Sequence, residues 1–162
     1  MNMKSSEDAD EQSLRRIPTY RAGVAQSSAY RLLKKFTEQS LKNHDITMMQ
    51  WFIIGTVYDA QDNGVTITEL SKIVDTNVPY ITNTVNALVL KGIVRREQKE
   101  GDSRSRVVTI DSTFIPTLKA IEQDLRHKMR TVLYANIAPE ELRVYVKVLF
   151  TLNSLLADNT EN

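Results

Sequence analysis

Uncharged hydrogen-bonding side chains recur between Asn77 and Gly92 of this 162-residue chain. Ile81, Val85 and Leu88 follow the spacing of one helical face there, so we expect them to point into a core. The side chains left outside are Tyr80, Thr82, Asn83, Asn86 and Ala87. An asparagine amide offers a paired donor and acceptor, and a tyrosine can stack or donate. This outer face therefore suits the edges of nucleic-acid bases.

A basic stretch follows that segment. From Lys91 to Arg106 there are six lysines and arginines against three acids, a local charge of +3 in a chain whose net charge is +1. The runs IVRRE and RVVTI are β-branched and of strand length, and the polar stretch QKEGDSRS between them is expected to form a turn. A hairpin with Arg104 and Arg106 beside its tip can reach phosphates or the minor groove of DNA. Asp102, two residues before Arg104, can hold its guanidinium by a charge-assisted hydrogen bond.

Two short helices are expected to position these residues. Thr68 is expected to cap the first helix, in which Leu70, Ile73 and Val74 form one apolar stripe. Asn77 can cap the second, with Pro79 inside its first turn and Gly92 at its end. Val65 to Ile67 can add a short strand beside the hairpin. This order of elements is that of a helix-turn-helix followed by a wing.

The stretch from Val65 to Asp111 resembles the MarR (multiple antibiotic resistance regulator) family of winged-helix transcription factors. The resemblance is carried by ITELSKIV, VNALVLKGIVRRE and DSRSRVVTI, in that order and spacing. In that family an Asp-x-Arg motif in the wing, here Asp102-Ser103-Arg104, places its arginine in the minor groove. The helix that starts near Asn77 would enter the major groove. Family recognition helices often carry a basic residue midway, whereas Asn83 stands there in this chain.

The pattern and the resemblance together give a set of residues expected at a DNA interface. They are Thr68, Asn77, Tyr80, Thr82, Asn83, Asn86, Arg96, Ser103, Arg104 and Arg106, with Asp102 positioning the wing.

The flanking segments are expected to be helical, which makes the fold mainly α with a small β-wing. Residues 1–17 are predicted to be a disordered acidic tail, and 18–46 an N-terminal dimerisation helix with Val24, Ser28, Leu32, Phe36 and Leu41 near one face. Residues 47–111 form the winged helix-turn-helix, whose first helix starts at Thr47. Residues 112–158 form two C-terminal dimerisation helices, one capped by Ser112 or Thr113 and running to about Ala135, the other following Pro139. All are expected to form one integrated domain.

Two amphipathic C-terminal helices need a partner for their apolar stripes. The same pair of helices in a second subunit would cover them, and a C₂ dimer would match two half-sites of a palindrome. An intramolecular bundle is the alternative.

Composition excludes several classes of function. Without cysteine there is no disulfide and no thiolate metal site. The two histidines, His44 and His127, have no carboxylate at ligand spacing, so no metal and no cofactor is expected. There is no phosphate-binding glycine loop and no nucleophile elbow, so an enzyme is not expected. Neither a membrane-length apolar run nor a secretory signal is present, which favours a cytoplasmic protein without membrane contact.

The predicted function is that of a double-stranded-DNA-binding transcriptional regulator, a ligand-responsive repressor that acts as a homodimer on a pseudo-palindromic operator. The resemblance implies a small aromatic or anionic effector in a cleft, which Tyr20, Arg21, Tyr30, Trp51 and Tyr58 could line. One alternative is a winged-helix module that binds protein rather than DNA. Another is a hydrolase that uses His44 or His127.

Overall fold

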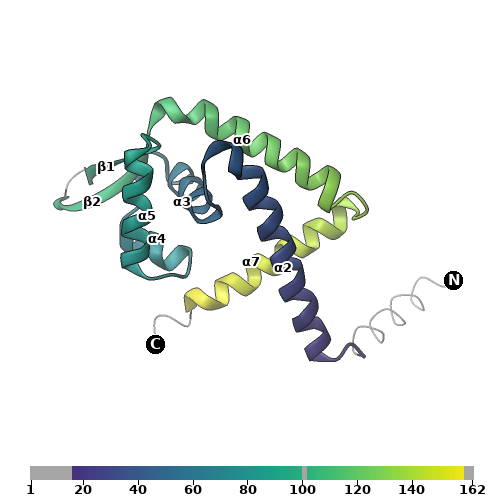
Figure 1. Cartoon of the computed structure of the whole chain (residues 1–162). Helices are drawn as coiled ribbons and strands as arrows, with labels where there is room; N and C mark the ends of the chain where they lie inside the picture. Colours follow the sequence, from purple (N-terminus) through teal and green to yellow (C-terminus); the bar gives the residue numbers. More distant parts are fainter. Residues whose placement is uncertain (1–15, 100–101, 159–162) are drawn as a thin grey trace. The chain divides into compact units, whose positions relative to one another are not determined.

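The computed structural model describes residues 16–99 and 102–158, without the side chains of 99, 102–105 and 156–158 (Figure 1). The acidic tail predicted for residues 1–17 therefore lies outside the described residues except at its last two positions. The chain divides into two compact units, Met1–Asp111 and Ser112–Asn162. The fold is mainly helical with one two-stranded antiparallel sheet, which confirms the predicted fold class.

The elements of the first unit follow the predicted order. They are α2 (Thr19–Leu41), the 3₁₀ turn η1 (Lys42–His44), α3 (Met48–Asp59), the 3₁₀ turn η2 (Gln61–Asn63), α4 (Ile67–Ile73), α5 (Val78–Leu90), β1 (Val94–Lys99) and β2 (Asp102–Ile110).

Helix α2 buries only its C-terminal end. Leu41 is buried and Phe36 is half-buried, whereas Val24, Ser28 and Leu32 are exposed. The predicted apolar face is thus covered within one chain only from about Leu33 onward. The helical stretch of α2 and η1 ends at Asp45, whose φ of 53° is left-handed.

Helix α3 starts where the sequence predicts. Thr47 and Gln50 form a capping box, in which the Gln50 amide N–H donates to the Thr47 hydroxyl and the Thr47 N–H donates to the Gln50 side chain. Ile53, Ile54 and Val57 are buried, as expected of so apolar a helix.

Helix α4 begins earlier than predicted, and Thr68 does not cap it. The cap is Thr66, which forms a capping box with Glu69. Val65 exchanges two backbone hydrogen bonds with Val108, so the chain stays extended up to Thr66 and turns helical immediately afterwards. The short strand predicted for residues 65–67 is therefore reduced to this single bridge.

The apolar stripe predicted for α4 is wrong at one residue. Leu70 and Ser71 are buried and Val74 is half-buried, but Ile73 is 55% exposed. Ile73 lies roughly 110° around the helix from the midpoint of Leu70 and Ser71, which takes it off the buried face.

Helix α5 follows its prediction closely. The Asn77 side chain accepts a hydrogen bond from the Tyr80 N–H at 2.9 Å, and Pro79 lies in the first turn. Ile81, Val85 and Leu88 are fully buried. Gly92 has φ 68°, a left-handed conformation that glycine adopts without strain.

The wing is longer than predicted. Strands β1 and β2 pair from Val94↔Ile110 to Gln98↔Arg106, with a register shift before Lys99↔Asp102. The stretch QKEGDSRS was expected to be a turn, but all of its described residues belong to β1 or β2, while residues 100–101 lie outside the described part of the chain. Ladder hydrogen bonds join backbone groups, so exposed polar side chains do not end a two-stranded hairpin.

The second unit contains the 3₁₀ turn η3 (Ser112–Phe114), α6 (Ile115–Lys128), the π-helical segment η4 (Met129–Leu133) and α7 (Pro139–Asp158). Neither Ser112 nor Thr113 caps α6. The cap position is held by Phe114, the last residue of η3, and no side chain makes a capping hydrogen bond there. Pro116 lies in the first turn, and Leu118, Ile121 and Leu125 are buried. Among the described residues, no helix is both long and apolar enough to cross a membrane.

Candidate nucleic-acid interface

The outer face of α5 presents amides, hydroxyls and apolar groups. Tyr80 is 48% exposed, and Asn83 and Asn86 are exposed as well. Steps of three residues place these side chains in one row along the helix. The structure therefore brings these predicted residues together on one surface, next to the β1–β2 hairpin (Figure 1).

The threonines of α5 use their hydroxyl protons inside the helix. Thr82 donates to the Val78 carbonyl at 2.9 Å, and Thr84 donates to the Tyr80 carbonyl at 2.8 Å. Thr82 is half-buried, so it offers less surface than predicted. What it can present outward is a methyl group and an oxygen acceptor rather than a donor.

Asn77 and Thr68 lie at the N-terminal ends of the two helices. The Asn77 side-chain oxygen is occupied as the cap of α5, so its role at an interface rests on its exposed position and on the positive end of the helix dipole. Thr68 is exposed in the first turn of α4, where its carbonyl accepts a hydrogen bond from Ser71.

The described part of the wing exposes cations. Arg96 and Arg106 are exposed, one on each strand. Asp102, Ser103 and Arg104 lie in β2 by their backbone, but their side chains lie outside the described residues. The expected contact between Asp102 and Arg104 therefore stays a prediction.

An ion pair at the base of the wing was not foreseen. The Arg95 Nε donates to Asp111 Oδ2 at 2.7 Å, and this hydrogen bond and charge raise the pKa of Arg95. Asp111 also donates its backbone N–H to the Ile93 carbonyl. The pair could have been predicted from the sequence, because Arg95 lies in the first predicted strand and Asp111 directly follows the second, so a hairpin brings their opposite charges together.

A second unforeseen pair joins the end of α5 to the turn before α3. The Lys91 ammonium lies 3.0 Å from Asp45 Oδ2 and also donates to the Asp45 carbonyl. The two residues are 46 positions apart, and no local pattern links them.

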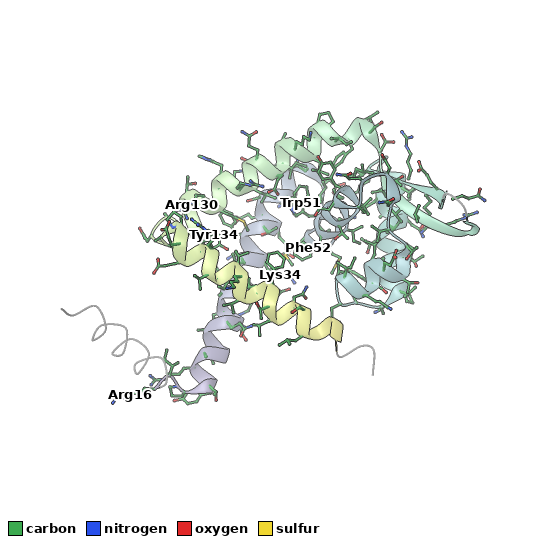
Figure 2. The ribbon with its side chains drawn as sticks, turned by 180° about the vertical axis from the view of Figure 1, so that it is seen from behind. Arg16, Lys34, Trp51, Phe52, Arg130 and Tyr134 are labelled. Atoms are coloured by element: carbon green, nitrogen blue, oxygen red, sulfur yellow. The ribbon has the colours of Figure 1, made fainter. Side chains whose placement is uncertain are left out.

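The residues named for an effector cleft lie on α2 and α3. Tyr20, Arg21 and Tyr30 are exposed on the N-terminal half of α2, whereas Trp51 and Tyr58 are half-buried on α3. Figure 2 labels Trp51 and Phe52 on α3 and Lys34 on α2. Trp51 is thus only partly a core residue.

The joint of α6 and α7 lies in the second unit. Arg130 donates to the Ile137 carbonyl at 3.3 Å, and burial, with a smaller effect of Tyr145, raises the pKa of Tyr134 (Figure 2). The histidines are exposed and far apart in sequence, His44 in η1 and His127 on α6. The described residues contain no cluster of three or more side chains that could hold a metal ion.

Comparison with known proteins finds a family similar to the winged region of this chain. The model of the MarR family matches residues 46–105, from the residue before Thr47 to the second strand of the wing. The winged helix-turn-helix of this chain is therefore similar to that of the MarR family.

Solved structures extend the likeness in fold over most of the chain. AbsC, a MarR family transcriptional regulator from Streptomyces coelicolor, matches with a TM-score of 0.74 and 19% identity, covering 86% of this chain and 94% of its own. A mutant MarR from E. coli complexed with operator DNA matches with a TM-score of 0.66 and 22% identity, covering 80% and 91%. CouR from Rhodococcus jostii RHA1, bound to p-coumaroyl-CoA, matches with a TM-score of 0.71 and 14% identity, covering 83% and 91%.

Proposed function

We propose that this chain belongs to the MarR family and is a sequence-specific double-stranded-DNA-binding transcriptional regulator, a ligand-responsive repressor in the cytoplasm that acts as a homodimer on a pseudo-palindromic operator. The observation that carries the proposal is the exposed amide face of α5 beside a wing that exposes Arg96 and Arg106. The structural likeness to E. coli MarR in complex with operator DNA supports it.

The wing and the outer face of α5 would contribute to DNA binding in different ways. Arginines of the wing would contact phosphates or enter the minor groove, which supplies affinity that depends on salt but not on sequence. The side chains of α5 would lie in the major groove and distinguish the bases. Thr68 and Asn77, at the starts of α4 and α5, would add contacts near the backbone.

Two features support the dimer and the effector. Helix α7 exposes Val144, Val148 and Phe150, and α2 exposes Val24 and Leu32, an amount of apolar surface that a second subunit would cover. CouR was solved with p-coumaroyl-CoA, which supports a role for a small molecule. Such an effector would act by binding one spacing of the two DNA-binding heads more tightly than another.

Fluorescence anisotropy with duplex DNA from upstream of this protein's own gene tests the proposal. We expect tight binding that resists competition by scrambled duplex and weakens with salt, each phosphate contact adding about 0.9 to the log–log slope. Arg104→Ala and Arg106→Ala should each weaken binding and lower that slope by about one contact. The matched control is Arg126→Ala, which removes an exposed arginine of α6 paired with Glu122.

A protein-binding winged helix is the second candidate, and one observation favours it. Helix α5 carries no charged residue, and Leu90 near its end is 88% exposed. Under this reading duplex affinity would not differ between specific and scrambled DNA, and neither wing substitution would change it. That outcome, with no duplex enriched in a selection from random sequences, would overturn the DNA-binding proposal.

A further inference from the structure

Helix α5 is unusual for a surface that would contact DNA, because its sequence VPYITNTVNALVL contains no lysine, arginine or acid. In the major groove, guanine presents two acceptors, and its commonest specific partner is arginine or lysine. Adenine presents an acceptor and a donor, which match the two ends of an asparagine amide. A helix with amides and no cations is therefore suited to adenine and poorly suited to guanine.

The geometry places two asparagines where neighbouring bases would lie. Asn83 and Asn86 are exposed on the same face, three residues apart, which is about 4.5 Å along the helix axis. Consecutive base pairs are about 3.4 Å apart, so the two amides can reach adjacent steps. Within the described part of the chain, neither side chain has a hydrogen-bond partner that would occupy its amide, in contrast to Asn77 at the cap.

The first turn of α5 supplies apolar groups beside the hydroxyl of Tyr80. Val78 and Pro79 are exposed there beside Tyr80. The half-buried Thr82 has its hydroxyl proton committed to the Val78 carbonyl. Apolar side chains in the major groove contact the methyl group of thymine, the one apolar feature among the base edges.

Two cations next to α5 in sequence are paired with carboxylates of this chain. Lys91, directly after the helix, is paired with Asp45, and Arg95 is paired with Asp111. The exposed arginines of the described wing lie on strands that would follow the backbone or the minor groove. The uncharged α5, its two exposed asparagines, its apolar first turn and the paired cations beside it are all features of the protein alone, whatever the operator sequence.

We infer that the half-site recognised by this chain has A·T pairs at its centre, with adenine bound by Asn83 and Asn86 and thymine methyl groups against Val78 and Pro79. The inference rests on the proposed DNA-binding function and deepens it by naming the base pairs that the α5 surface selects.

Selection from a library of random duplexes with the full-length protein is the first test. We expect enriched sequences with two inverted half-sites, each with adjacent A·T pairs at its centre. Half-sites centred on G·C pairs would overturn this inference and leave the DNA-binding function standing. If no sequence were enriched, the proposed function would fail, and this inference with it.

Modified bases then test which side chain contacts which base. Replacing a central adenine by 7-deazaadenine removes the N7 acceptor and should weaken binding of the wild-type protein about threefold to tenfold. Asn83→Ala or Asn86→Ala should weaken binding to the unmodified site roughly fivefold to a hundredfold. Whichever of these two variants lacks the contact to that adenine should bind the modified and unmodified sites equally well. An undiminished loss in both variants would show that other residues bind the adenines.

Thymine is tested by replacing it with uracil, which lacks the methyl group. We expect about a fourfold loss for each methyl group in contact, and a smaller loss in Val78→Ala. Equal losses in the wild type and in the variant would remove Val78 from the inference.

The conversion Asn83→Arg supplies the reciprocal test, because an arginine at this position should move the preferred base from adenine to guanine in a repeated selection. The matched control is Asn43→Ala, which removes an exposed asparagine of η1 and should change neither affinity nor preference. Alanine has a higher helix propensity than asparagine, so loss of folding does not explain a weaker Asn83→Ala or Asn86→Ala. An unchanged preference in Asn83→Arg would contradict the assignment of Asn83 to a base.

Discussion

Neighbouring arginines of β1 differ in what they can do. Arg95 is bound to Asp111 at the base of the wing, while the next residue, Arg96, is exposed on the other face of the strand. An arginine held by a charge-assisted hydrogen bond would have to give up that partner before it bound a phosphate. At the scale of single residues, the positive charge of the wing is thus smaller than the sequence count implies.

Thr109 in β2 gives a prediction at the same scale. Its hydroxyl oxygen is buried without a hydrogen-bond partner, and such a group costs about 1–3 kcal/mol. Thr109→Val keeps the shape and removes that cost, so we expect the free energy of unfolding in urea to rise by about 1 kcal/mol. Thr56→Val is the control, because the Thr56 hydroxyl donates to the Phe52 carbonyl, and no gain is expected there. A loss of stability in Thr109→Val would mean that water satisfies its hydroxyl.

At the scale of elements, the helix-turn-helix is defined by its caps. Thr66 begins α4 and Asn77 begins α5, and each satisfies a backbone N–H of its first turn. The spacing T-x-x-E from Thr66 to Glu69 is a capping-box signal that is present in the sequence. Thr68, the predicted cap, lacks this signal, since the residue three positions after it is a serine.

Paired substitutions distinguish the two threonines. Thr66→Ala should lower the free energy of unfolding by about 1 kcal/mol, because it removes the hydroxyl that accepts from the Glu69 N–H. Thr68→Ala should change it by less than about 0.5 kcal/mol, since Thr68 is exposed inside the first turn. Chemical denaturation of both variants checks this. Equal losses, or a larger loss in Thr68→Ala, would contradict the observed cap.

At the scale of the whole molecule, each unit leaves apolar surface uncovered. In the second unit, α7 exposes Val144, Val148, Phe150 and Leu152, and in the first unit, α2 exposes Tyr20, Val24 and Leu32. Large exposed apolar side chains mark interaction sites in soluble proteins when they gather in patches, and these residues of α7 and α2 are the candidates for such a patch. The proposed homodimer accounts for it, and it also supplies the second recognition helix that a palindrome requires.

Sedimentation equilibrium tests the dimer. We expect the wild-type chain to sediment with twice its mass of 18.5 kDa. Phe150 is 72% exposed, so Phe150→Asp should leave the fold of one chain intact while placing a charge in the apolar interface, which shifts the equilibrium to the monomer. Lys119→Asp, an exposed charge reversal on α6, should remain dimeric. A wild type that stays monomeric at all concentrations would rule out the homodimer.

Features that depend on neighbours along the chain could be predicted from the sequence alone. Helix α5, its cap at Asn77, its buried face and its end at Gly92 follow from spacings of three and four residues and from local hydrogen bonds, which a linear pattern records. The amide face that carries the inference about base pairs was visible for the same reason.

Other features depend on contacts between residues far apart in sequence and could be found only from the tertiary structure. Pairing of Val65 with Val108 set the start of α4, the register of β1 and β2 set the length of the wing, and packing left Ile73 outside the core. The pairs Lys91–Asp45 and Arg95–Asp111 likewise exist only once the chain has folded. Such contacts form only after loops have closed and cores have packed, and no short-range periodicity encodes which residues then meet.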